Sequence, residues 1–203
     1  MDNLVVLNNE KVSKKNNEFY TRNFNFKILP EGLNRYFKVK YIVRRSNTDE
    51  HHKLNLKDVK TASNIIQFIY FVISTFKNKN TKYYIITISP YTFIASLFLF
   101  LFRRKVYVYL ISSGYEEWNF ILGSWSVWIY HIMFKIVTFN STVIALHDRL
   151  YNKKNGNVIA SSTLDENWLQ NFKEVKLDKA RFLNVSRVNP EKGIYEFLEI
   201  FKK

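Results

Sequence analysis

"YYIITISPYTFIASLFLFLFRRKVYVYLIS", residues 83–112, contains the pattern that decides the fold. An apolar run (83–89) ends at a Ser-Pro pair, a helical stretch follows (91–102), and a second apolar run (105–112) closes the unit. Because proline pushes the preceding residue out of helical geometry, the strand ends at Ser89 and a helix begins directly after it. Two strands joined by a helix are typical of a right-handed crossover in a parallel sheet.

The same stretch resembles a membrane span in length. From Ile85 to Phe102 there are 18 residues without a charge, and a spanning helix needs about 17–25. The Ser-Pro break and the two arginines after Phe102 favour a buried strand followed by a helix of a soluble core. A helix that spans or dips into the membrane is the alternative.

Apolar runs and helical patterns alternate along most of the chain. The strands are continuous apolar runs, as expected when helices cover both faces of a parallel sheet. We therefore expect an α/β fold, a Rossmann-like doubly wound parallel sheet, over residues 1–165, then a linker at 166–179 and the start of a second Rossmann-like domain at 180–203. Within the first domain the predicted strands are 3–8, 35–45, 83–89, 105–112, 141–147 and 157–162, and the predicted helices are 64–76, 91–102 and 118–139.

Charge and composition restrict the possible functions. Lys and Arg outnumber Asp and Glu by 31 to 17, which gives a formal charge of +14 and attracts anionic partners. The basic residues are dispersed and form no basic-aromatic platform, so nucleic acid is not an expected partner. The lack of cysteine excludes disulfides and thiolate chemistry,, and His51 and His52 have no partner at metal-ligand spacing, so we expect no metal and no cofactor. The N-terminus carries no secretory signal pattern, which predicts a cytoplasmic location, with peripheral contact to an anionic membrane as a further expectation.

A second strand-loop-helix pattern is "FLNVSRVNPEKGIYEFLEIFKK", residues 182–203. Arg187 at the strand end and Lys192 before the helix would both face the carboxyl edge of a sheet, where ligands of such folds bind. Gly193 permits an anion to approach the helix N-terminus closely. The pattern suits a diphosphate ligand, and an ordinary loop with two solvated cations is the alternative.

This stretch resembles the opening of the C-terminal domain of family-4 glycosyltransferases, which have the GT-B fold. Arg187, Glu191, Lys192 and Gly193 match the family's pattern, whereas Ser186 stands where the family usually has glycine. The resemblance implies that Arg187 and Lys192 contact the diphosphate of a nucleotide-sugar donor. It also implies a retaining transfer to a glycan or lipid-linked acceptor, of the kind used in cell-surface polysaccharide synthesis.

The resemblance further implies a truncated chain. The family's paired glutamates, which grip the donor, would follow Lys203. We therefore expect the 203-residue chain alone to be inactive as a transferase. A non-catalytic basic α/β module that binds an anionic membrane surface or a phosphorylated ligand is the alternative function.

Two further segments supply acceptor-side candidates. The strand at 105–112 is followed by Gly114 and Tyr115 and then by Glu116 and Glu117, one of which would bind or deprotonate an acceptor hydroxyl. The alternative is that both acids only favour the start of a helix. The basic segment 8–24 is predicted to be a loop that contacts a phosphorylated lipid carrier or the membrane through Lys14, Lys15 and Arg22, and a solvated loop is the alternative.

Overall fold

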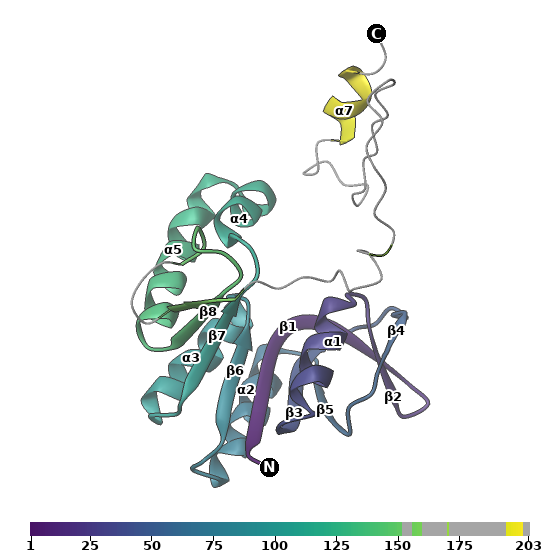
Figure 1. Ribbon diagram of the computed structural model, residues 1–203, viewed down its shortest axis with the longest axis vertical. Coiled ribbons are helices and arrows are strands. Elements are labelled where there is room, and N and C mark those ends of the chain that lie inside the picture. Colours follow the sequence, from purple (N-terminus) through teal and green to yellow (C-terminus); the bar gives the residue numbers. More distant parts are fainter. Residues whose placement is uncertain (152–155, 160–169, 171–193, 201–203) are drawn as a thin grey trace. The chain divides into compact units, whose positions relative to one another are not determined.

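The computed structural model describes residues 1–151, 156–159, 170 and 194–200 (Figure 1). The chain divides into two units, Met1–Ala160 and Ser161–Lys203. In the second unit the described helix is α7 (Ile194–Ile200), which confirms the helix predicted after Gly193. Apart from Gln170, the predicted linker (166–179) and the strand expected after residue 180 lie outside the described residues.

Nine strands of the described residues form one sheet, and seven of these run parallel in the order β5-β3-β1-β6-β7-β8-β9. Counted along the chain, this order is 3-2-1-4-5-6-7, which extends the strand order of dinucleotide-binding Rossmann folds by one strand. The predicted Rossmann-like α/β fold is therefore confirmed. The strands are β1 (Asn3–Lys15), β3 (Lys38–Arg45), β5 (Asp58–Ala62), β6 (Lys82–Ile86), β7 (Val106–Leu110), β8 (Thr142–Ala145) and β9 (Gly156–Val158).

The predicted loop at 8–24 is wrong for most of its length, because β1 continues to Lys15 and then turns back. Asn16 and Asn17 have φ values of 50° and 63° and form the two-residue connection to β2 (Glu18–Thr21). Positive φ at both central residues is the type I′ geometry that suits a hairpin, and asparagine tolerates it better than most residues. β2 in turn pairs antiparallel with β4 (His52–Leu54). We call β2, β4 and the end of β1 (residues 12–15) the hairpin extension.

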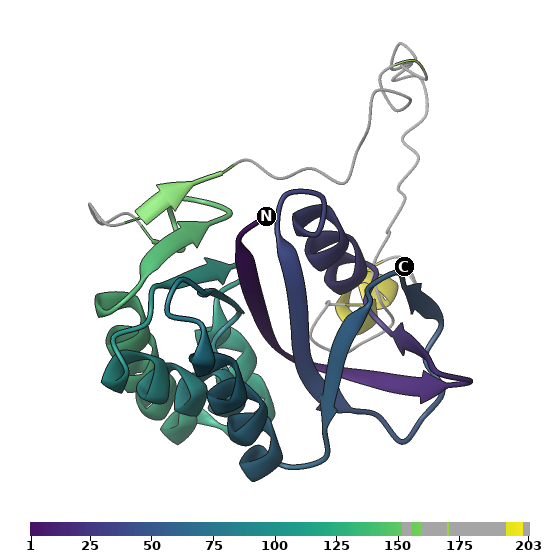
Figure 2. The same cartoon turned by 90° about the horizontal axis from the view of Figure 1, so that it is seen from below.

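Helices cover the two faces of the sheet unequally (Figure 2). On one face α2, α3 and α5 pack on the sheet through buried side chains such as Phe68, Leu99 and Met133. On the other face α1 packs through Phe26 and Leu29. These helices are α1 (Asn25–Leu33), α2 (Ile65–Ser74), which ends in the 3-10 turn η1 (Thr75–Lys77), α3 (Pro90–Leu101) and α5 (Ser124–Phe139).

The single helix predicted at 118–139 is wrong, because the chain forms two helices here. α4 (Gly114–Leu122) and α5 meet at Gly123, which has φ 88° and ψ 171°. Residues with a Cβ rarely adopt this backbone conformation, so glycine at this position ends one helix and allows the next to start in a new direction. Ser126 secures the corner by donating from Oγ to the carbonyls of Trp118 (2.8 Å) and Gly123 (2.7 Å).

The uncharged stretch 85–102 is split as predicted, between β6 and α3. Ser89 is the N-cap of α3 and its Oγ accepts a hydrogen bond from the Thr92 backbone N–H (3.3 Å), while Pro90 occupies the first turn. This is a capping box, which stabilises a helix start at this position. Within the part of the chain that the structure describes, every helix is too short or too polar to cross a bilayer.

The turn between β6 and α3 contains backbone strain at Thr87, which has φ 60°. A β-branched residue in this left-handed region costs about 1 kcal/mol or more. Its backbone N–H donates to the Tyr109 carbonyl (3.0 Å) and its carbonyl accepts from Thr92 Oγ1 (3.1 Å), so the surrounding hydrogen bonds hold the strained conformation.

We expect Thr87→Asn to stabilise the fold by about 1 kcal/mol, because asparagine adopts positive φ more readily. Urea unfolding of the purified protein measures the change in free energy of unfolding. The matched control is Thr61→Asn in the regular strand β5, where the loss of a β-branched residue lowers stability. Equal losses of stability in the two variants would show that Thr87 is not strained.

Candidate functional site

The carboxyl ends of the parallel strands form the edge that is uppermost in Figure 1. The strand order reverses between β1 and β6, so the connections from these two strands diverge at this edge, which is where open parallel sheets have their ligand crevice,. Polar residues from three strands lie at this switch point: Asn8 to Glu10 in β1, Arg44 in β3, and Thr87 directly after β6.

A β-bulge shapes β1 at the switch point. The register of β1 with β3 shifts between Leu7 and Lys11, which places Asn8, Asn9 and Glu10 in the irregular segment. Asn8 is buried, and its Nδ2 donates to Tyr41 Oη (3.2 Å) while its Oδ1 accepts from the Glu10 backbone N–H (3.1 Å). Bulges commonly occur beside active sites, where they redirect side chains. Here the bulge brings a carboxylate to the crevice.

Glu10 is held firmly through one of its two carboxylate oxygens. Oε1 accepts hydrogen bonds from Thr21 Oγ1 (3.1 Å) and from the Asn23 backbone N–H (3.3 Å). Oε2 has no hydrogen bond among the described residues and is the atom that could receive one from a ligand. Burial raises the pKa of Glu10, and the nearby Glu50 charge adds to this, although the two hydrogen bonds oppose it. Such a carboxyl is a better proton acceptor than an exposed one.

Arg44 spans the switch point from the other side of β1. Its guanidinium lies 4.7 Å from the centroid of the Tyr91 ring, in the first turn of α3, and its Nη1 donates to Asn9 Oδ1 (3.4 Å). A fixed cation beside a helix N-terminus creates positive potential at the crevice. One carboxylate and one oriented guanidinium thus lie near the switch point. Tyr91, which the guanidinium contacts, belongs to the core on the α3 face of the sheet, whereas Tyr41, the partner of Asn8, belongs to the core on the α1 face.

A second polar centre follows β7, where the sequence predicted acceptor-side residues. Gly114 and Tyr115 line a cavity of about 70 Å³, whereas Glu116 and Glu117 are exposed in the first turn of α4 and do not line it. This cavity is smaller than the roughly 300–1,000 Å³ of usual ligand pockets. The acid-base role of Glu116 or Glu117 stays a prediction.

Tyr130 and Gly114 fit closely at this cavity. A Cβ added at Gly114 would lie 2.2 Å from the ring of Tyr130, and burial raises the pKa of Tyr130 to about 12, with nearby Tyr115 adding to the effect. Tyr115 packs edge-on against Tyr130 with centroids 4.9 Å apart, and its Oη is hydrogen-bonded to His131 Nδ1 (2.9 Å). Glycine at position 114 is therefore required by packing.

The basic residues predicted for the acceptor side belong to the hairpin extension and the segment after it. Lys14 Nζ lies 5.7 Å from the Phe19 ring centroid, and Lys15 Nζ lies 3.7 Å from Asp49 Oδ2 with both side chains exposed. Arg22 Nε pairs with the buried Glu50 at 3.3 Å, which gives this arginine a structural role. Whether these cations contact a ligand stays a prediction.

Glu50 anchors the hairpin extension to the segment after β3. Its Oε1 accepts from Ser46 Oγ (2.9 Å) and Thr48 Oγ1 (3.1 Å), and its backbone N–H donates to Ser13 Oγ (3.2 Å). Burial alone would raise the pKa of Glu50, but these two hydroxyl donors and Arg22 together outweigh burial and lower it. Glu10 and Glu50 thus have pKa values shifted in opposite directions.

The residues predicted to bind the donor diphosphate, Arg187, Lys192 and Gly193, lie outside the described residues. Within residues 1–151, 156–159, 170 and 194–200, no three His, Asp or Glu side chains gather as metal ligands would.

Sequence reasoning missed the switch-point residues Asn8, Glu10, Arg44 and Tyr91. The signal available was the polar run "NNE" (8–10) directly after the apolar residues 4–7, at the end of the first strand of a Rossmann-like fold. It was overlooked because the segment was taken as part of a longer basic loop.

Comparison with known proteins adds no relative: no protein-family model, curated protein or solved structure matches this chain.

We expect Gly114→Ala to destabilise the protein by about 1–3 kcal/mol, because the added methyl group displaces the buried Tyr130 ring. The matched control is Gly32→Ala in α1, where an added Cβ meets nothing within 4 Å and should stabilise the helix by about 0.5–1 kcal/mol. Urea unfolding monitored by circular dichroism measures both. A neutral Gly114→Ala variant would disprove the close fit.

We expect Glu10→Gln and Glu50→Gln to change the stability of the fold in opposite directions at neutral pH, and both changes to shrink in acid. Because the pKa of Glu10 is raised on folding, ionising it weakens the fold, so Glu10→Gln stabilises at neutral pH, and the gain shrinks as pH falls from the raised pKa toward the ordinary carboxyl value of about 4,. Because the pKa of Glu50 is lowered, Glu50→Gln destabilises at neutral pH, and that cost shrinks in acid. Thermal unfolding between pH 3 and pH 8 provides the test, and parallel profiles for the two variants would contradict the pKa directions.

Proposed function

We propose that this chain is a nucleotide-sugar-dependent glycosyltransferase component whose described Rossmann-like unit is the acceptor side. The donor is a nucleoside-diphosphate sugar, and the acceptor is a glycan or lipid-linked glycan of the cell-surface polysaccharide type. The reaction is proposed to retain the anomeric configuration.

One observation carries the proposal: a Rossmann-type strand order with polar residues at its switch point stands in the same chain as the Arg187, Lys192, Gly193 pattern. Open parallel sheets bind their ligands at this position. The strand order by itself supports many functions. The pattern resembling a donor-diphosphate site narrows these to glycosyl transfer.

In this proposal the two parts have different tasks. Arg187 and Lys192 bind the donor diphosphate and stabilise the negative charge that develops as the nucleotide leaves, which is electrostatic catalysis. Glu10 accepts a hydrogen bond from the acceptor hydroxyl through Oε2, which has no partner among the described residues, and orients that hydroxyl. Arg44 contributes positive charge at the crevice. Glu116 and Glu117 remain candidates for a second contact with the acceptor.

We expect the full 203-residue chain to bind UDP or GDP weakly but saturably, as detected by saturation-transfer NMR at constant low salt. Arg187→Ala and Lys192→Ala should each weaken binding about tenfold or more, because each removes a charge-assisted hydrogen bond to the diphosphate. The matched controls are Arg35→Ala and Lys79→Ala, which remove exposed cations of the first unit.

Two results would count against the proposal. One is the absence of binding by any nucleoside diphosphate. The other is an equal loss of binding in the control variants, which would indicate only general attraction to a basic protein and favour the non-catalytic basic module.

A further inference from the structure

The outer face of α5 is largely apolar. Ser126, Tyr130, Met133 and Val137 face the sheet and are buried. Five side chains at helical spacing on the opposite side remain exposed, which are Trp125 (64%), Trp128 (69%), Ile129 (37%), Ile132 (36%) and Phe139 (85%). A surface helix normally presents polar side chains to water. We call these five residues the outer α5 stripe.

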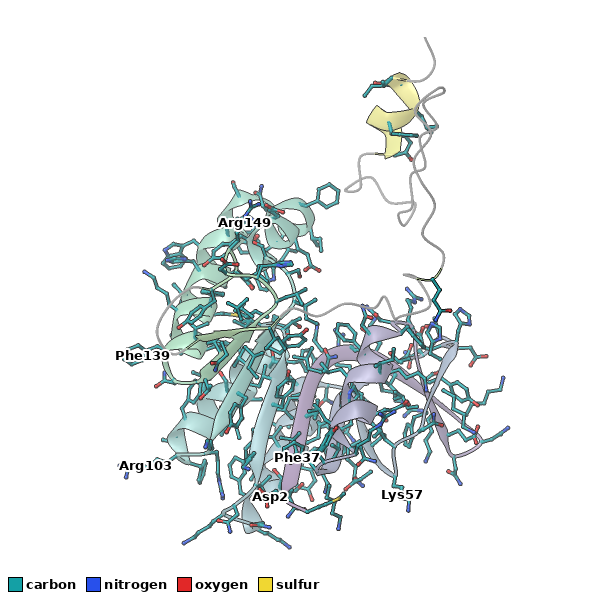
Figure 3. All side chains as sticks on the ribbon, in the orientation of Figure 1. Asp2, Phe37, Lys57, Arg103, Phe139 and Arg149 are labelled. Carbon is teal, nitrogen blue, oxygen red and sulfur yellow. The ribbon has the colours of Figure 1, made fainter. Side chains whose placement is uncertain are left out.

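α4 extends the outer α5 stripe around the Gly123 corner. Phe120, Ile121 and Leu122, at the end of α4, are 60%, 64% and 47% exposed, and α4 adjoins α5 in Figure 1. In Figure 3 the Phe139 ring projects outward at the other end of α5. A contiguous exposed apolar surface of this length is typical of a binding face.

The charges around α5 are positive, whereas the exposed Glu116 and Glu117 lie in the first turn of α4, one turn before Phe120 and Ile121. No acidic residue occurs from 118 to 147, which includes all of α5, and none occurs from 59 to 115, which includes α2 and α3 on the same face of the sheet. Lys135 is exposed three residues after Ile132 and four before Phe139, so it lies within the outer α5 stripe. Arg103, at the end of α3, projects from the same margin of Figure 3 as Phe139.

These features distinguish between two occupants. A second copy of the chain would bring another charge of +14 and would bury Lys135 against an apolar partner, and both effects are unfavourable. An anionic bilayer has neither disadvantage. Tryptophan prefers the interfacial region of a bilayer, a lysine within an apolar stripe can extend its amine to lipid phosphates, and basic residues near the surface add electrostatic attraction.

We propose that the outer α5 stripe and the end of α4 dock onto an anionic bilayer. α5 lies in the interface plane, with Trp125, Trp128 and Phe139 inserted between headgroups and Lys135 paired with phosphate. This inference does not depend on the glycosyltransferase proposal, since it concerns binding to lipid and not catalysis.

Vesicle flotation of the full chain tests the proposal. We expect binding to vesicles of phosphatidylcholine with 30% phosphatidylglycerol, weaker binding to pure phosphatidylcholine, and a decline as salt rises. The double variant Trp125→Gln/Trp128→Gln should bind about tenfold or more weakly, because it removes two inserted aromatic side chains. Both residues are exposed, so the fold tolerates the change, and circular dichroism verifies this.

Matched controls distinguish vesicle binding through the outer α5 stripe from nonspecific hydrophobic binding and from general electrostatic attraction. Tyr36→Gln removes an aromatic side chain that is 74% exposed outside the stripe and should bind like wild type. Lys135→Glu should weaken binding to the anionic vesicles more than Lys57→Glu does.

Three outcomes would overturn the proposal: no binding to the anionic vesicles, equal loss of binding in Tyr36→Gln, or unchanged binding in the double tryptophan variant. If that variant converts a dimer to a monomer in light scattering while vesicle binding is unchanged, the stripe is a self-association surface.

Discussion

Parallel pairing on both edges of β1 is the constraint on which the rest of the described fold depends. Leu4 to Leu7 pair with β3 on one edge and with β6 on the other, and all four side chains are buried. A strand enclosed on both edges and both faces must be apolar and cannot shift its register without exposing that surface. Because the chain winds outward from β1 in both directions, the helices diverge at its carboxyl end, and the crevice follows from this topology.

The chemistry of the crevice depends on how β1 leaves the core. Once β6 has ended, β1 would present an unpaired edge, and β2 pairs with that edge from Val12 to Lys15. Val12 pairs with both Arg45 and Thr21, so β2 and β3 lie on opposite edges of β1. The bulge between Leu7 and Lys11 separates the two pairing regions. Glu10 therefore lies where the parallel sheet gives way to the hairpin extension, and Thr21, at the end of β2, donates to it.

The elements predictable from sequence were those whose apolar runs are long and bounded by strong signals. Ser89-Pro90 located the start of α3, and the uncharged stretch around it was correctly divided, although β6 ends at Ile86, three residues before the predicted end at Ser89. The hairpin extension was missed because its strands are short and polar, and because Asn16-Asn17 was not taken as a turn signal. The break at Gly123 was missed because apolar residues on both faces of α4 and α5 suggest one continuous buried helix.

The candidate site was less predictable than the fold for a physical reason. Glu10 and Arg44 are far apart in the sequence, and both lie near the switch point only because β1 and β3 are neighbours. The spacing of residues within one segment of sequence does not reveal which strands become neighbours in the sheet. The sequence predicted Gly114 and Tyr115 after the strand β7, yet Tyr130 fills the space above Gly114 and leaves a cavity of about 70 Å³, which is smaller than usual ligand pockets.

The apolar residues that concealed the Gly123 corner also define the outer α5 stripe. A helix that is apolar on both faces satisfies two demands: one face completes the core through Tyr130, Met133 and Val137, and the other must be covered by something other than water. Residues 118–147 contain no acid, so the covering surface meets no negative charge from this segment. α4 begins at Gly114, at the carboxyl edge of the sheet, and a bilayer seated on α4 and α5 would lie next to that edge. An acceptor anchored in lipid would then reach the sheet from the side on which the polar residues lie.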